Sequence, residues 1–110
     1  MLIFMEYASG GELFSKLKPD VGLSEAEAQN YFRQLLAAVK YLHTANLCHR
    51  DIKPENILFT EDGKLKLIDF GNCSMLRSRS GMCLKISSLT FKASGKLLQK
   101  SIEFYYRYSL

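Results

Sequence analysis

We expect an α+β fold for these 110 residues. Two patterns agree with that class: a long helical segment from Ser24 to about Thr44, and two short apolar segments on either side of the turn sequence TEDG at residues 60–63. The hydrophobic content of 47% and the charged content of 24% are those of an ordinary globular protein. A single domain is the default expectation for a chain of this length.

The first part of the chain contains an apolar segment followed by a short helical pattern. Residues 2–5 (LIFM) are predicted to form a buried strand, which Gly10 and Gly11 end. The segment ELFSKLK, residues 12–18, then predicts a short helix with its apolar residues on one side. These residues are Leu13, Phe14 and Leu17.

The long helix has a clear start signal. Ser24 and Glu27 have the spacing of a capping box, in which each residue satisfies a free backbone N–H of the other. Residues 31–42 (YFRQLLAAVKYL) are apolar at nearly every position, with few polar exceptions. A helix that is apolar nearly all round is expected in the interior of a larger structure.

A β-hairpin is predicted after the long helix. A strand at Ile57–Phe59 leads into the turn TEDG, in which Asp62 and Gly63 are expected to supply residues with positive φ. The segment KLKLI, residues 64–68, alternates lysine and leucine, so its lysines should face outward and its leucines inward. This strand leads directly into the sequence DFG.

Charge is divided unevenly along the chain. Residues 1–71 hold 8 Lys and Arg against 10 Asp and Glu, a net charge of −2, whereas residues 72–110 hold 7 against 1, a net charge of +6. Residues 78–110 show no clear caps and only a patchy period. We therefore expect a structured part over residues 1–77 and a divergent basic tail over 78–110, the tail being a solvated face or unselected sequence rather than a nucleic-acid or membrane patch.

Targeting signals are not visible in the sequence. The opening residues MLIFM are too short for the apolar region of a signal peptide, and no segment approaches the roughly 20 apolar residues of a membrane span. The three cysteines are odd in number and do not form a disulfide framework. These observations favour the nucleus or the cytoplasm, without a membrane partner.

Four polar side chains suggest a common chemistry. Asp51, Lys53 and Asn56 lie in the loop HRDIKPEN, and Asp69 begins DFG eighteen residues after Asp51. Two carboxylates and a carboxamide suit Mg²⁺, which prefers oxygen ligands, while a carboxylate near a hydroxyl can orient it and take its proton. Transfer of a phosphoryl group requires mainly this positioning and charge neutralisation.

The segments LCHRDIKPENILF and LKLIDFG resemble the catalytic loop and the metal-binding segment of eukaryotic protein kinases. Lys53 within HRDIKPEN is typical of serine/threonine kinases. FMEYASGGELF looks like the hinge with its following helix, and PDVGLSEAEAQNYFRQL looks like the linker and long helix of the large lobe. The combination is similar to the checkpoint effector kinases of the calcium/calmodulin-dependent kinase group. It implies a truncated kinase-like α+β fold.

The resemblance implies a role for each of the four polar residues. Asp51 would be the catalytic base and Lys53 a lysine that contacts the transferred phosphate. Asn56 and Asp69 would hold Mg²⁺. The cofactors implied are therefore ATP and Mg²⁺, with protein serine or threonine as acceptor.

The resemblance also implies a nucleotide site and a substrate site. Met5 matches the gatekeeper, the backbones of Glu6 and Ala8 match adenine contacts, and Leu58 matches part of the adenine floor. Glu12 would meet the ribose or a basic substrate residue, and Glu55 is a second carboxylate for an arginine upstream in the substrate. A preference for substrates with basic residues near Ser or Thr follows, with a possible place in checkpoint signalling.

Other polar residues have plainer interpretations. His49 is expected to pack structurally and not to act as a base, while the purpose of Arg50 stays open. His43, Cys48 and His49 do not have the spacing of a tetrahedral zinc site.

Several parts of a kinase are not found in this sequence. There is no Gly-rich phosphate loop and no strand lysine with its partner glutamate before the hinge, and no APE-like motif after DFG. We therefore expect the chain by itself to be inactive. The alternatives are a catalytically silent kinase-like module that binds a partner, or an unrelated basic binding module in which the tail matters most.

Overall fold

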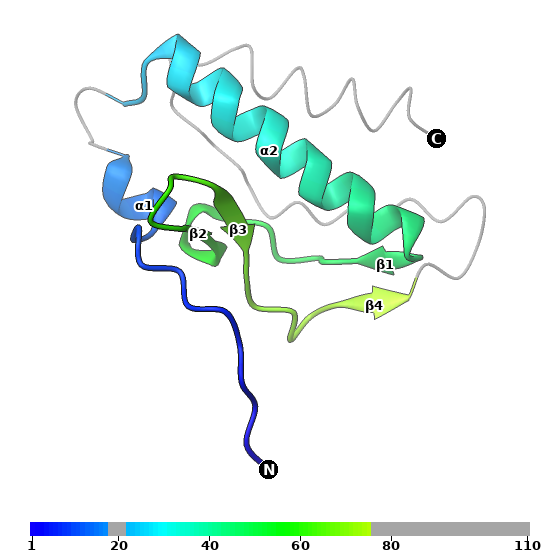
Figure 1. The fold of residues 1–110 in the computed structure, drawn as a ribbon. Helices are drawn as coiled ribbons and strands as arrows, with labels where there is room; N and C mark the ends of the chain where they lie inside the picture. Colours follow the sequence, from blue (N-terminus) through cyan, green and yellow to red (C-terminus); the bar gives the residue numbers. More distant parts are fainter. Residues whose placement is uncertain (18–21, 76–110) are drawn as a thin grey trace.

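The computed structural model describes residues 1–17 and 22–75. Figure 1 shows a long helix lying across small antiparallel sheets. In chain order the elements are α1 (Leu13–Lys16), α2 (Glu25–Thr44), β1 (Leu47–Cys48), the 3-10 turn η1 (Pro54–Asn56), β2 (Ile57–Phe59), β3 (Leu65–Leu67) and β4 (Ser74–Met75). This is the expected α+β architecture. Residues 78–110, predicted to be a divergent tail, lie outside the described part.

Helix α2 starts and ends where the sequence predicts. The Ser24 hydroxyl accepts from the backbone N–H of Glu27, and the Glu27 carboxylate accepts from the backbone N–H of Ser24, so the capping box is complete. The Ser24 hydroxyl also donates to the Glu27 carboxylate at 2.7 Å, and this bond, together with the one from the Ser24 N–H, lowers the pKa of Glu27 because both stabilise its charged form. One stripe of α2 is buried, formed by Ala28, Leu35, Val39 and Leu42, whereas Tyr41 is 73% exposed.

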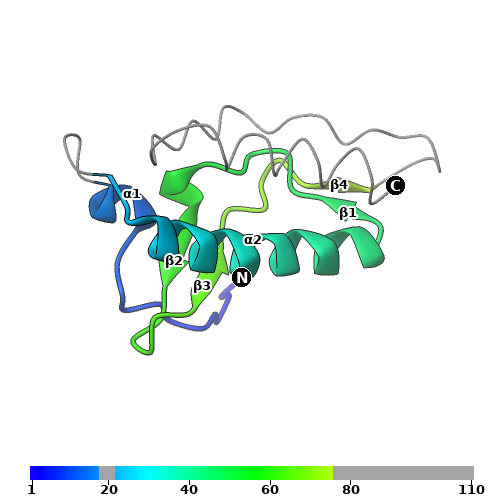
Figure 2. The ribbon, with the colours of Figure 1, turned by 90° about the horizontal axis from the view of Figure 1, so that it is seen from above.

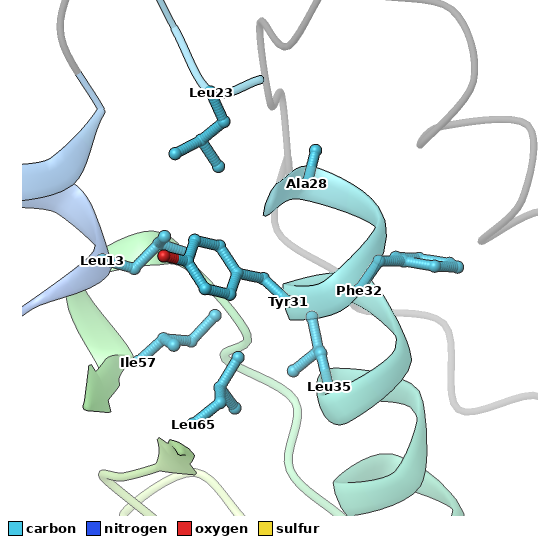
Figure 3. Close-up of a pocket in the computed structure, with 8 residues that line it drawn as sticks. All are labelled: Leu13, Leu23, Ala28, Tyr31, Phe32, Leu35, Ile57 and Leu65. Atoms are coloured by element: carbon cyan, nitrogen blue, oxygen red, sulfur yellow. The ribbon is translucent and has the colours of Figure 1, made fainter. Parts of the chain in front are cut away.

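The core lies between α1, α2 and the β2–β3 hairpin. Phe59 is 1% exposed and lies between the Tyr31 ring, 4.8 Å away between centroids, and the Lys16 ammonium, 4.3 Å from the Phe59 centroid. Figure 3 shows the adjoining small pocket, where the Tyr31 ring points from α2 toward Leu13. Its lining is apolar apart from the Tyr31 hydroxyl: Leu13, Leu23, Ala28, Tyr31, Phe32, Leu35, Ile57 and Leu65. With no charged side chain, this pocket is part of the core and not a phosphate site.

The hairpin follows the predicted pattern with one difference. Leu58 pairs with Lys66, and the leucines at 65 and 67 pack on the core while Lys66 does not. The turn closes with the Gly63 N–H donating to the Thr60 carbonyl at 3.0 Å. Only Gly63 has positive φ, at 79°, so the expectation of positive φ at Asp62 was wrong. Asp62 instead accepts from Thr60 and pairs with Lys64, which hold its chain in an ordinary conformation.

The predicted buried strand at residues 2–5 is not present. Leu2, Ile3, Phe4 and Met5 are 85%, 70%, 92% and 85% exposed, and residues 1–9 form an extended segment without helix or strand, which leads to the N-terminus in Figure 1. A strand needs a neighbour for its backbone hydrogen bonds, and no strand within the described residues runs beside this segment. Apolar composition alone was therefore a poor guide here.

Two smaller features differ from expectation. In α1, Leu13 is fully buried but Phe14 is 57% exposed, because the helix is short and only one of its sides meets the core. The pairing of β1 with β4, beside the C-terminal end of α2, was not predicted. Figure 2 shows α2 running over β3 and reaching β1, and both contacts are present.

Of the two described cysteines, Cys73 is a free thiol and Cys48 is buried. Among the described helices, none is both long and apolar enough to cross a membrane.

Candidate active site

Asn56 and Asp51 lie at the centre of the candidate site. The Asn56 side-chain N–H₂ donates to the Asp51 backbone carbonyl at 2.9 Å and to its carboxylate at 3.1 Å. Asn56 is buried at 6% exposure, in the 3-10 turn that Pro54 begins. Since the amide nitrogen is turned toward Asp51, the Asn56 Oδ1 atom is the one that can face a cation.

Lys53 extends over the same carboxylate. Its Nζ lies 3.0 Å from Asp51 Oδ2, with the lysine side chain 40% exposed and the aspartate side chain 17% exposed. The hydrogen bond and charge of Asp51 raise the pKa of Lys53, and the charges of Glu55 and Asp69 add to the effect. Lys53 therefore lies close enough to Asp51, Glu55 and Asp69 to interact with the charge of each.

His49 links the loop to the segment before DFG. The Asp51 backbone N–H donates to His49 Nδ1 at 3.2 Å, so Nε2 carries the hydrogen that bonds the Ile68 carbonyl at 2.8 Å. The ring is 2% exposed and meets Phe70 edge-on at 4.9 Å between centroids. With both nitrogens bonded, His49 has the structural role expected of it and no lone pair available to act as a base.

The Ile68 backbone is held on both sides. Its N–H donates to the Asn56 carbonyl at 2.9 Å, and its carbonyl accepts from His49. Asp69 follows with φ of 62°, an uncommon value for a residue other than glycine, and its carboxylate accepts from the Gly71 N–H at 3.2 Å. These three hydrogen bonds, two at the Ile68 backbone and one at the Asp69 carboxylate, set the position of Asp69 relative to Asn56.

Arg50 has a definite contact, although its purpose was left open from the sequence. It also has positive φ, 66°, and its Nε donates to the Asn72 carbonyl at 2.5 Å. The contact joins the loop HRDIKPEN to the residues that follow DFG. The antiparallel β1–β4 pairing is a second connection between the same two parts of the chain.

The segment before α1 is attached to β2 by its backbone. The Gly10 N–H donates to the Phe59 carbonyl at 2.6 Å, and the Phe59 N–H donates to the Gly11 carbonyl at 2.9 Å. Glu12 then forms a β-bridge with Leu58. Glu12, the predicted ribose contact, and Leu58, part of the predicted adenine floor, are therefore neighbours.

The other predicted adenine contacts are less enclosed. Met5 is 85% exposed, and Ala8 is half-buried in the extended segment. Glu6 is tied to the hairpin, because its carboxylate lies 2.9 Å from Lys66 Nζ. The described residues do not bring Met5 together with Asp51 or Asp69.

The two predicted substrate carboxylates come from neighbouring elements. Glu12 immediately precedes α1 and Glu55 lies in η1, and α1 contacts η1. Both side chains belong to exposed residues.

The oxygen atoms available here fit Mg²⁺ that is held jointly by the protein and a bound phosphate, rather than by protein ligands alone. Asn56 and Asp69 offer oxygen atoms, and no group of three His, Cys, Asp or Glu residues suited to a metal is present in residues 1–17 and 22–75. Mg²⁺ is commonly held by one or two carboxylates together with substrate phosphates and water.

Sequence reasoning missed two residues that shape this site. Lys66 anchors Glu6, and its alternation with leucine had already placed it on the outer side of the strand. Gly10 lies so close to β2 that a Cβ atom there would be 2.4 Å from the Thr60 carbonyl oxygen. No pattern in the sequence signals that close approach, since it depends on two segments distant in the chain.

Known proteins are similar to this chain in sequence. Residues 1–104 match the protein kinase domain family. The chain is 52% identical over 77 residues to serine/threonine-protein kinase grp of Drosophila melanogaster, covering 70% of this chain and 15% of that protein. It is 53% identical over 76 residues to serine/threonine-protein kinase chk-1 of Caenorhabditis briggsae, covering 69% and 15%. It is 52% identical over 82 residues to serine/threonine-protein kinase CHK1 of Saccharomyces cerevisiae, covering 74% and 16%.

The antiparallel sheets, the long helix and the Asp51–Asn56–Asp69 group now have a common explanation: the chain belongs to the protein kinase family. It is similar to serine/threonine kinases of the checkpoint group, as the sequence indicated. It spans about 15% of the length of these relatives, so what the whole protein does is a matter for proposal.

Proposed function

We propose that this chain contributes the catalytic loop of a serine/threonine protein kinase that transfers phosphate from ATP to proteins. The observation that carries the proposal is the convergence of Asp51, Lys53 and Asn56 with the segment that leads into Asp69. Such convergence of a carboxylate base, a cation and metal-binding oxygens is what phosphoryl transfer requires.

The residues would divide the work as follows. Asp51 accepts the proton of the substrate hydroxyl, and the amide of Asn56 holds its carboxylate in place. Lys53, a lysine ammonium at neutral pH whose pKa Asp51 raises further, balances negative charge on the transferred group. Asn56 and Asp69 would hold Mg²⁺, which would supply further neutralisation of the phosphates when bound.

We also propose that the substrates carry basic residues near the accepting Ser or Thr. The support is that Glu12 and Glu55 are exposed and lie on contacting elements. An arginine can bind such carboxylates by paired hydrogen bonds. We expect protein substrates and no membrane or nucleic-acid partner, which binding assays at several salt concentrations test. We expect the protein to act in the nucleus or cytoplasm, which imaging of the tagged protein tests.

The 110 residues do not include a Gly-rich phosphate loop. We therefore propose that by themselves they transfer little or no phosphate, because each missing preorganised group costs roughly 10²–10³ in rate. The alternative function, a silent kinase-like module that binds a partner, becomes the better account if no nucleotide is bound.

Two measurements test the proposal. Millimolar Mg-ATP should raise the melting temperature of the protein, and Asp69→Asn should abolish that rise, whereas the exposed control Glu61→Gln should keep it. In the full-length protein, peptides with an upstream Arg should be phosphorylated faster than matched peptides with Ala. The absence of any nucleotide effect in the wild type contradicts a nucleotide site, and equal peptide rates contradict the basic preference.

A further inference from the structure

Lys66 makes a contact that the catalytic arrangement above does not use. Its ammonium lies 2.9 Å from the Glu6 carboxylate, and the two side chains are 42% and 64% exposed. Residues 1–9 form no helix or strand, and within the described residues this ion pair joins their side chains to the hairpin. The contact joins segments sixty residues apart in the sequence.

The register of the hairpin explains why Lys66 can reach Glu6. Lys66 is directly opposite Leu58 in the antiparallel pair, and opposite residues project from the same face of a sheet. Leu58 is also bridged to Glu12, just after the segment ends. The face of Leu58 is thus bordered by Lys66 on one strand and by the Gly10–Glu12 attachment on the other.

The segment is consequently held at two points. The backbone of Gly10 and Gly11 is bonded to Phe59 in β2, and the side chain of Glu6 is bonded to Lys66 in β3. The first point fixes one end of the segment, and the second limits how far the peptide groups of residues 6–9 can swing about it. A restrained backbone loses less conformational freedom when it binds a ligand.

We propose that Lys66 is a positioning residue for nucleotide binding: its ion pair with Glu6 holds the extended segment over the Leu58 face of the hairpin, so that the backbone of residues 6–8 is oriented to meet a purine base. The role rests on the nucleotide site proposed above. Lys66 itself touches neither the phosphates nor the reacting atoms in this arrangement.

Lys64 offers a matched control. It lies on the same side of the hairpin and its Nζ is 2.6 Å from the Asp62 carboxylate, a residue of its own turn. Replacing Lys64 removes the same charge as replacing Lys66, together with a longer-range attraction to Glu6, but leaves the direct Glu6–Lys66 ion pair in place. A difference in nucleotide affinity or cleavage rate between the two variants therefore reports the loss of the Glu6–Lys66 ion pair and not a change in the overall charge of the hairpin.

The size of the effect is limited by exposure. Exposed ion pairs are weak and are screened by salt, so loss of this one should change nucleotide affinity by about two- to fivefold at low ionic strength and by less at about 1 M salt. A much larger loss would indicate damage to the fold rather than loss of positioning.

The structural half of the proposal is tested without nucleotide. Chymotrypsin cleavage after Tyr7, which is 86% exposed, should be faster in Lys66→Met than in the wild type and unchanged in Lys64→Met. Neither substitution alters the sequence around the cleaved bond. Equal cleavage rates in all three proteins would contradict the claim that the Glu6–Lys66 ion pair restrains this segment.

The functional half uses Mg-ATP as the probe. Lys66→Met should weaken Mg-ATP binding two- to fivefold, Lys64→Met should not, and exchange of the two charges (Glu6→Lys with Lys66→Glu) should restore much of the affinity. Wild-type binding that is unchanged, or stronger, in Lys66→Met overturns the positioning role alone. A wild-type protein that binds no nucleotide refutes the proposed function, and the positioning role with it.

Discussion

The side-chain amide of Asn56 donates to both the backbone carbonyl and the carboxylate of Asp51, at 2.9 and 3.1 Å. One residue therefore fixes the loop conformation and the orientation of the carboxylate at once. The same residue accepts from the Ile68 N–H through its own carbonyl. Asn56 is thus the point at which the catalytic loop is joined to the segment that precedes Asp69.

Asn56→Asp should separate geometry from chemistry at this point. The new side chain has nearly the same shape, but it places a second carboxylate about 3 Å from that of Asp51, where two negative charges repel and the pKa of the pair rises. Phosphate transfer by the full-length protein should fall by about 10²–10³. The control is Asn30→Asp on the exposed surface of α2. Retention of full activity in Asn56→Asp would contradict the role given to the amide.

Gly10→Ala should loosen the attachment of the N-terminal segment. A methyl group there would meet the Thr60 and Phe59 carbonyl oxygens at 2.4 and 2.7 Å, so the backbone must move and the Gly10–Phe59 hydrogen bond must lengthen. We expect a loss of about 1–3 kcal/mol in the free energy of unfolding, as in other overpacked sites. Urea denaturation measures it, with Ser9→Ala as the control, and equal stability of the two variants would show that the approach is less close.

Ser24→Ala should weaken the start of α2. Loss of the cap hydroxyl should lower the free energy of unfolding by about 1 kcal/mol, whereas Ser15→Ala, outside the cap, should have a much smaller effect. The pKa of Glu27 should rise toward its ordinary value of 4.5, because the hydrogen bond from the Ser24 hydroxyl is the main cause of its lowering. A carboxyl NMR titration follows that change, and an unmoved Glu27 pKa would disprove the assignment.

Asp62 should make stability depend on pH in the acid range. Its hydrogen bonds to Lys64 and Thr60 lower its pKa from 3.8 to about 2. Because the folded pKa is depressed, the stabilisation is complete above about pH 4 and is lost as pH falls through about 2. The difference in melting temperature between wild type and Asp62→Asn should therefore shrink between pH 4 and pH 2. A difference that stays constant over this range would mean that Asp62 titrates normally.

The local elements were predictable because their causes are local. Ser24 and Glu27 are three residues apart, so the cap that starts α2 is visible in the sequence, and the helix ends at Thr44 as expected. The Lys–Leu alternation of residues 64–67 likewise specified which side of β3 is buried. The spacing of HRDIKPEN and DFG identified the family, which the protein kinase domain match confirms.

The predictions were wrong where the burial of a residue depends on which other segments pack beside it. LIFM has the composition of a buried strand, yet a strand forms only beside a partner, and residues 1–9 have none within the described part. Phe14 was predicted to share one side of a short helix with Leu13, but it is 57% exposed whereas Leu13 is buried, because only one side of α1 meets the core. The roles of Met5, Ala8 and the other nucleotide contacts stay predictions.

The family, the long capped helix, the hairpin and the identities of Asp51, Lys53, Asn56 and Asp69 follow from the amino-acid sequence alone. How the site is assembled depends on tertiary structure: His49 bonds the Ile68 carbonyl, the Asn56 carbonyl accepts from the Ile68 N–H, and Lys66 pairs with Glu6. The physical reason is range. Caps and alternation depend on neighbours a few residues away, whereas each of these site contacts depends on how the backbone returns on itself, which no local pattern specifies.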